Sequence, residues 1–142
     1  DKDQYVAEKY VHFDAKRVDD ILDLFVTGEY LPLKGVITFA AFPFCGQAWN
    51  LFLLESYCRR FSERFRFMEL NLNLKNAGVI VRKSCGLSYS QIMADAVAVS
   101  GIALEPESIK DFLYKKGYIG SRSFSSVDEL LEQAKGIREK RG

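Results

Sequence analysis

The sequence has little of what disulfide-linked and metal-bound domains require. Its 142 residues include 3 Cys, 1 His and 3 Pro. The cysteines, Cys45, Cys58 and Cys85, are odd in number and form no Cys-x-x-Cys pair, which excludes a small disulfide scaffold. A structural zinc site needs four Cys or His ligands at close spacing, and the single histidine, His12, does not provide them. We therefore expect reduced thiols, no metal and no cofactor.

Long hydrophobic runs and a strong net charge are also missing. No apolar stretch reaches the ~18 residues that a membrane span needs, and no signal-peptide pattern stands at the start. The formal net charge is +1, so no overall field marks the chain for nucleic acid or membrane. We predict a cytoplasmic protein without a membrane partner. Because the chain begins Asp1-Lys2-Asp3 without Met, we expect a piece of a larger intracellular protein.

What the chain does have is enough apolar material for one core, at 48% hydrophobic residues. We predict one α+β domain over 1–142, with helices packed on a small antiparallel sheet. Its charges are uneven, since 1–55 carry 5 Lys/Arg and 9 Asp/Glu, whereas 56–126 carry 11 and 6. This imbalance indicates either a basic binding face in the middle of the chain or two halves that attract each other.

The first subpart, 1–86, begins with a predicted helix. Asp14 is a suitable N-cap, and Gly28 can end the helix. The apolar stripe of this helix is Val18, Ile21, Leu22 and Phe25. We expect its three aspartates to form a solvated face: Asp19, Asp20 and Asp23.

Three more elements are predicted before residue 87. The apolar run 36–42 (VITFAAF) favours a strand buried on both faces, and a long helix from about Gln47 to Phe61 carries Trp49 in its apolar stripe. Residues 68–75 alternate strictly between apolar and polar, and the β-branched run 79–81 follows a Gly-containing turn. This pattern predicts an antiparallel hairpin with one buried face and one exposed face.

The second subpart, 87–142, shows short helices with clear ends. Ser88 can cap a helix that ends at Ser100-Gly101, and Pro106 fits the first turn of another that ends at Gly117. An extended pair is predicted over 118–124, followed by a last helix opened by a capping box at 126–129. In order, 88–124 are helix, turn, helix and wing.

This layout resembles the winged-helix (helix-turn-helix) superfamily. The residues that carry the resemblance are Ser88 to Val97, Ile109 to Leu113 and Lys116-Gly117-Tyr118-Ile119, about a quarter of the chain. The resemblance implies double-stranded DNA as a partner, with the second helix in the major groove. The nucleic-acid-binding residues it implies, with the nearby basic pair after the hairpin, are Arg82, Lys83, Lys110, Tyr114, Lys115 and Arg122.

The same second helix also carries charges of the opposite sign. Glu105, Glu107 and Asp111 stand near its N-terminal end and would repel phosphates, although acids also stabilise a helix N-terminus. Winged helices serve in protein contacts as well as DNA contacts, and the fold alone does not choose between them. A continuous basic face would favour DNA, whereas an apolar patch would favour a protein partner.

An enzymatic alternative centres on Cys45. The thiol follows the predicted strand and precedes the predicted long helix, where a helix N-terminus can lower its pKa. A nucleophilic cysteine also needs a base, and His12 is the only histidine. We therefore predict a non-catalytic binding or regulatory module, with DNA as the first partner to test. A protein-interaction or structural domain is the first alternative, and a cysteine-dependent enzyme is the second.

Overall fold

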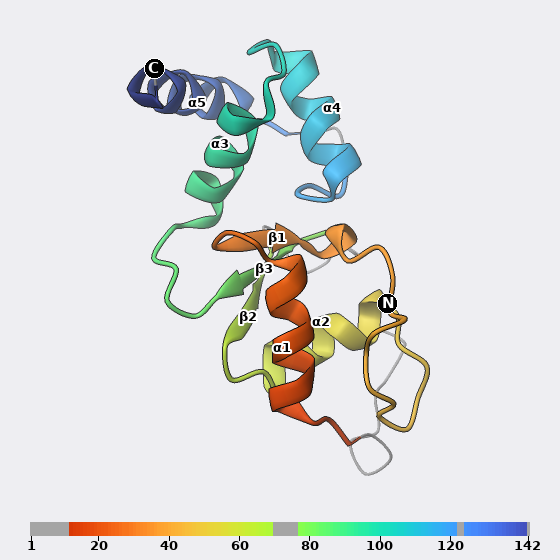
Figure 1. Ribbon diagram of the computed structural model, residues 1–142. Coiled ribbons are helices and arrows are strands. Elements are labelled where there is room, and N and C mark those ends of the chain that lie inside the picture. The colour runs from red at the N-terminus through yellow and green to blue at the C-terminus, as the bar shows by residue number, and fades with distance from the viewer. Residues whose placement is uncertain (1–11, 70–76, 122–123, 142) are drawn as a thin grey trace.

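The computed structural model describes residues 12–69, 77–121 and 124–141 (Figure 1). Within them the chain forms five α-helices, one 3-10 helix and three strands, which confirms the α+β class. In chain order the elements are α1 (Ala15–Phe25), β1 (Tyr30–Pro32), η2 (Leu33–Gly35), α2 (Leu51–Arg60), β2 (Phe65–Met68), β3 (Val79–Arg82), α3 (Tyr89–Ser100), α4 (Pro106–Lys116) and α5 (Val127–Arg141). None of the helices in these ranges is long and apolar enough to cross a membrane.

The strands form one antiparallel sheet in the order β1-β3-β2. Val81, in the central strand, lies opposite Tyr30 on one side and Arg66 on the other. The predicted antiparallel partner of β3 is β2, but β2 covers Phe65–Met68 and shares only Met68 with the predicted strand over 68–75. Residues 70–75 of the predicted strand lie outside the described residues.

Both faces of the sheet are covered by helices (Figure 1). Val79 and Val81 belong to the α3–α5 core, formed by the sheet and helices α3, α4 and α5. Ile80 belongs to the α1–α2 core on the opposite face, and all three side chains are fully buried. The prediction of one exposed sheet face is therefore wrong. The central strand is apolar at three consecutive positions, which is typical of a strand with two packed faces.

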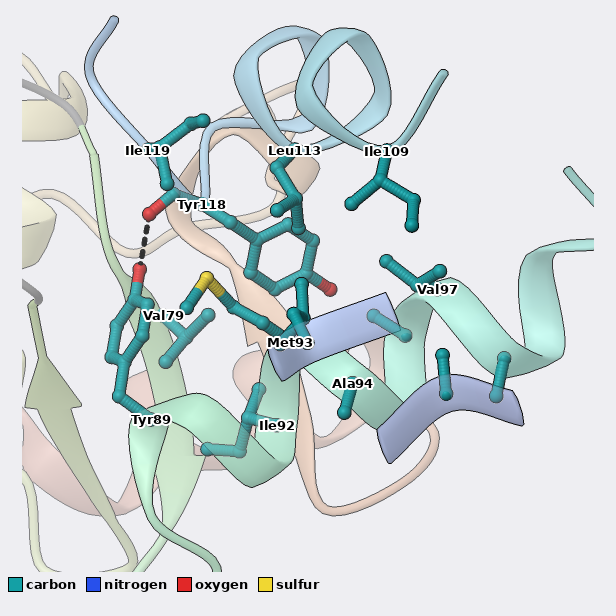
Figure 2. Packing of buried hydrophobic residues seen from close by; sticks show 14 of the residues in the cluster. Val79, Tyr89, Ile92, Met93, Ala94, Val97, Ile109, Leu113, Tyr118 and Ile119 are labelled. Carbon is teal, nitrogen blue, oxygen red and sulfur yellow. Dashed lines mark hydrogen bonds between the residues drawn. The ribbon is translucent and has the colours of Figure 1, made fainter. Parts of the chain in front are cut away.

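The C-terminal helices have the ends predicted for them. Ser88 and Gln91 form a capping box at the start of α3, and Gly101 ends it with φ of 80°. Figure 2 shows Met93 of α3 and Leu113 of α4 within the same packed core. These contacts hold α3 and α4 together, because both helices bury their apolar stripes against each other and against the sheet.

Arg138 of α5 completes the turn between α3 and α4. Its guanidinium group donates to the carbonyl oxygens of Ala98 (2.8 Å), Val97 (3.3 Å) and Ile102 (2.7 Å). Carbonyls at the end of a helix have no partner within the helix, so a cation here satisfies hydrogen bonds and favours the negative end of the helix dipole. The last helix thereby fixes the geometry of the α3–α4 turn.

The predicted strand over 36–42 is wrong, because this segment is an irregular loop. The position beside β3 is occupied instead by β1, which includes a proline and gave no strand signal. Val36 and Phe42 of the loop are buried in the α1–α2 core, whereas Ile37 is 84% exposed. Individual side chains of this segment therefore pack against the α1–α2 core, and its backbone does not pair as a strand.

The helix predicted from Gln47 begins later, at Leu51. Asn50 is its N-cap and accepts a hydrogen bond from the Leu53 backbone N–H at 2.8 Å. Trp49 therefore precedes the helix and is half-buried. Its indole Nε1–H donates to the Pro43 carbonyl at 2.8 Å, and its ring contacts other aromatic rings of the α1–α2 core. The indole closes the loop onto the core and does not form part of a helical stripe.

The prediction of a solvated aspartate face on α1 is wrong for Asp19, because the side chain of Asp19 is fully buried. Its carboxylate accepts hydrogen bonds from the Tyr57 hydroxyl (2.7 Å) and the Ser62 hydroxyl (2.6 Å). The backbone N–H groups of Glu63 and Arg64 donate to its other oxygen at 3.0 and 3.1 Å. One buried carboxylate thus fixes the α2–β2 turn against α1.

Four partly or fully buried tyrosines make the stability of the fold sensitive to alkaline pH. Burial raises the pKa of Tyr30, Tyr57, Tyr89 and Tyr118 above the ordinary value of about 10. Because the unfolded chain ionises first, their contribution to stability is complete below about pH 10 and is lost as the pH rises further. We expect the tyrosinate absorbance of these four residues to rise only above about pH 10, together with the loss of circular dichroism. In urea all seven tyrosines should titrate in one step near pH 10.

Candidate functional site

Two of the predicted nucleic-acid-binding residues, Arg82 and Lys83, make polar contacts within the protein. The guanidinium of Arg82 donates to the carbonyls of Gly28 and Val26, pairs with Asp23, and lies over the Phe65 ring. The Lys83 ammonium donates to the Ser62 carbonyl at 2.9 Å. These contacts connect the end of β3 to the α1 side of the sheet and to the α2–β2 turn. They disfavour a role for either side chain in binding phosphates.

The predicted contacts on α4 alternate with acids. Lys110 pairs with Glu107 at 3.5 Å, and Lys115 pairs with Asp111 at 3.0 Å. Tyr114 is 39% exposed on the same helix. Since α4 packs on the α3–α5 side of the sheet, these residues are in a different layer from the α1 contacts of Arg82. Arg82 and the two α4 lysines therefore make their ion pairs with different helices.

The predicted wing is described only in part, because Arg122 lies outside the described residues. Residues 117–121 form bends and contain no strand. Tyr118 and Ile119 are buried in the α3–α5 core, and the Tyr89 hydroxyl donates to the Tyr118 carbonyl at 2.6 Å (Figure 2). The winged-helix layout stays a prediction.

Cys45 does not stand at a helix N-terminus, because α2 begins six residues later. Its thiol is buried and donates to the Gln47 carbonyl at 3.6 Å. His12 is exposed and contacts Cys45 through its backbone, where the His12 N–H donates to the Cys45 carbonyl at 2.8 Å. None of the described residues places a base at this buried sulfur, and a nucleophilic cysteine requires such a base. In the described ranges no cluster of three His, Cys, Asp or Glu side chains is placed to hold a metal ion.

A groove of about 810 Å³ lies between the β1–η2 segment and helices α3 and α4. Two exposed apolar side chains line it, Ile37 at 84% and Val99 at 54% exposure. The full lining is Tyr30, Leu31, Pro32, Lys34, Gly35, Ile37, Ala96, Val99, Ser100, Ile102, Phe112, Lys115, Lys116 and Tyr118. We call this feature the β1–α4 groove.

Sequence reasoning did not find the β1–α4 groove. Its lining combines the consecutive elements β1 and η2 with α3 and α4, which come more than fifty residues later in the chain. The sequence did not predict β1. Ile37 was expected in a buried strand, so its exposure was also unexpected. Among the predicted nucleic-acid-binding residues that the structure describes, Lys115 alone lines the groove.

Comparisons with known proteins add no assignment. No model of a protein family matches the chain, and neither a curated protein nor a solved structure matches it.

Proposed function

We propose that the chain is a non-catalytic module that binds another protein through the β1–α4 groove. The observation that carries the proposal is the pair of apolar side chains Ile37 and Val99, which line the groove and are mostly exposed to solvent. Apolar side chains gathered in one surface hollow are typical of interaction sites, whereas isolated ones are common everywhere. Three free cysteines support placing this module in the reducing cytoplasm.

The charge distribution favours a protein partner over DNA. Duplex binding draws its affinity from lysines and arginines that neutralise phosphates. Arg82 and Lys83 make internal contacts, and Lys110 and Lys115 each have an acid on the same helix. We therefore expect no measurable affinity for duplex DNA even at about 50 mM salt, where phosphate contacts are strongest.

The test is quantitative affinity capture with a groove variant and a matched control. Ile37→Ser combined with Val99→Ser should lose the captured partner, because it removes the apolar contacts. Leu24→Ser should retain it, since Leu24 is 72% exposed on α1, across the sheet from the groove. All three positions are exposed, so each change should alter stability by less than about 0.5 kcal/mol.

Two outcomes would contradict the proposal. One is partner capture that is unchanged in the groove variant. The other is duplex DNA binding that weakens with salt and is lost in Lys110→Glu with Lys115→Glu, which would support the DNA-binding alternative.

A further inference from the structure

We infer that the β1–α4 groove accepts an amphipathic helix with acidic flanks from the partner protein. This inference rests on the proposed function and specifies the chemistry of the partner segment. It combines the charge of the groove's lysines, the apolar character of much of its lining, and the poor suitability of β1 for pairing with another strand.

The rim of the groove is positively charged. Three of its lining residues are exposed lysines, Lys34, Lys115 and Lys116, and none of the described aspartates or glutamates lines it. Lys115 pairs with Asp111, whereas Lys34 and Lys116 form no ion pair within the part of the chain that the structure describes. Two ammonium groups therefore face solvent beside an apolar surface, and a complementary segment carries carboxylates at its edges.

The position of Lys34 is set by Gly117 at the end of α4. The alkyl chain of Lys34 lies so close over Gly117 that a Cβ atom there would be 2.9 Å from Lys34 Cδ. This packing holds the lysine of η2 beside the last turn of α4, which carries Lys115 and Lys116. The positive charge is thereby gathered at one end of the groove, although it comes from two segments far apart in the chain.

Apolar side chains form much of the groove. Ile37, Val99, Ile102 and Phe112 line it, and the first two are mostly exposed. An amphipathic helix buries apolar residues spaced three and four apart in such a groove while its flanks remain polar. Duplex DNA would leave these side chains without an apolar partner, because its outer surface is a phosphate backbone.

An added strand fits this groove poorly. β1 is an edge strand, but it is three residues long and ends at Pro32, which has no backbone N–H to donate. A peptide that paired with β1 would gain few main-chain hydrogen bonds, which supply most of the affinity in strand addition. Side-chain packing and charge must therefore supply the affinity, and a helix presents both on adjacent faces.

The probe is a labelled synthetic peptide of about 18 residues, with leucines at helical spacing and glutamates on the flanks. Its control has the same leucines with lysines in place of the glutamates. Fluorescence anisotropy should show that the acidic peptide binds at least about tenfold more tightly than the basic one. Lys34→Glu with Lys116→Glu should lower the affinity for the acidic peptide about tenfold and raise the affinity for the basic peptide. Lys135→Glu on α5, outside the groove lining, should change neither affinity.

The inference is overturned if both peptides bind equally, if neither binds, or if the charge-reversed variant retains its preference for the acidic peptide. These failures are distinct from failure of the proposed function. If the inference alone fails, the Ile37→Ser and Val99→Ser variant still loses the captured partner. If the proposed function fails, that variant captures the partner as the unsubstituted chain does.

Discussion

Replacing Asp19 with alanine should lower the free energy of unfolding by about 3–5 kcal/mol. The substitution removes a fully buried carboxylate and leaves the Ser62 hydroxyl and two backbone N–H groups without their acceptor. An unsatisfied buried donor costs about 1–3 kcal/mol. Because several donors lose their acceptor at once, this cost exceeds the free energy gained by removing a buried charge. Urea denaturation followed by circular dichroism measures the change directly.

The neighbouring carboxylate provides the control for Asp19. Asp20 lies on the same helix and is exposed, and it pairs with Lys16 at 3.6 Å and with Arg64 at 2.5 Å. Arg64 beside it lowers the pKa of its carboxyl group. Asp20→Ala should still cost less than about 1 kcal/mol, because water screens exposed ion pairs. If the two variants unfold at the same urea concentration, the buried hydrogen bonds of Asp19 do not stabilise the fold.

Replacing Gly78 with alanine should cost about 2–4 kcal/mol. Gly78 has φ of +154°, a backbone conformation that residues with a Cβ atom rarely adopt. An added Cβ would lie 2.7 Å from the carbonyl oxygen of Met68 and would overlap the Phe67 ring. The same residue donates its N–H to the Gly117 carbonyl and accepts from the Leu33 N–H, so a shift of its backbone disturbs β1 and the end of α4 together.

Gly86 is the matched control for this substitution. A Cβ at Gly86 would meet no atom within 4 Å, and its backbone has no positive φ of the kind found at Gly78. Gly86→Ala should therefore leave stability unchanged within about 0.5 kcal/mol or raise it slightly. A thermal melt of the two variants in parallel makes the comparison. Equal melting temperatures would mean that the strand junction can relax around the added methyl group.

Many helix ends were predictable because they depend on nearby residues, although α1 ends at Phe25, before the predicted Gly28. Ser88, Gly101 and Pro106 act within a few residues of their own position, and the structure places each of them as expected. Asp14 likewise caps α1 by accepting from the Arg17 N–H. Such signals can be recognised in the sequence because they need no knowledge of the tertiary fold.

Several of the errors involve residues whose surroundings come from distant parts of the chain, whereas the Asn50 cap of α2 is a local signal that was missed. Asp19 has the same local pattern as its solvated neighbours, and only the approach of Ser62 and the following turn makes it buried. The apolar run containing Ile37 matches a strand in composition, but β1 holds the place beside β3. The β1–α4 groove was missed for the same reason, since no local pattern brings Lys34 next to the end of α4.

The central position of β3 has a consequence for the order in which the chain can fold during synthesis. A ribosome completes β1 and β2 before β3, yet each of them pairs with β3. The sheet therefore cannot form when only the first half of the chain has emerged, and Ile80 is missing from the α1–α2 core until then. The emerging segment keeps two unpaired strands and an incomplete core, a state in which exposed edges and apolar surface favour chaperone binding.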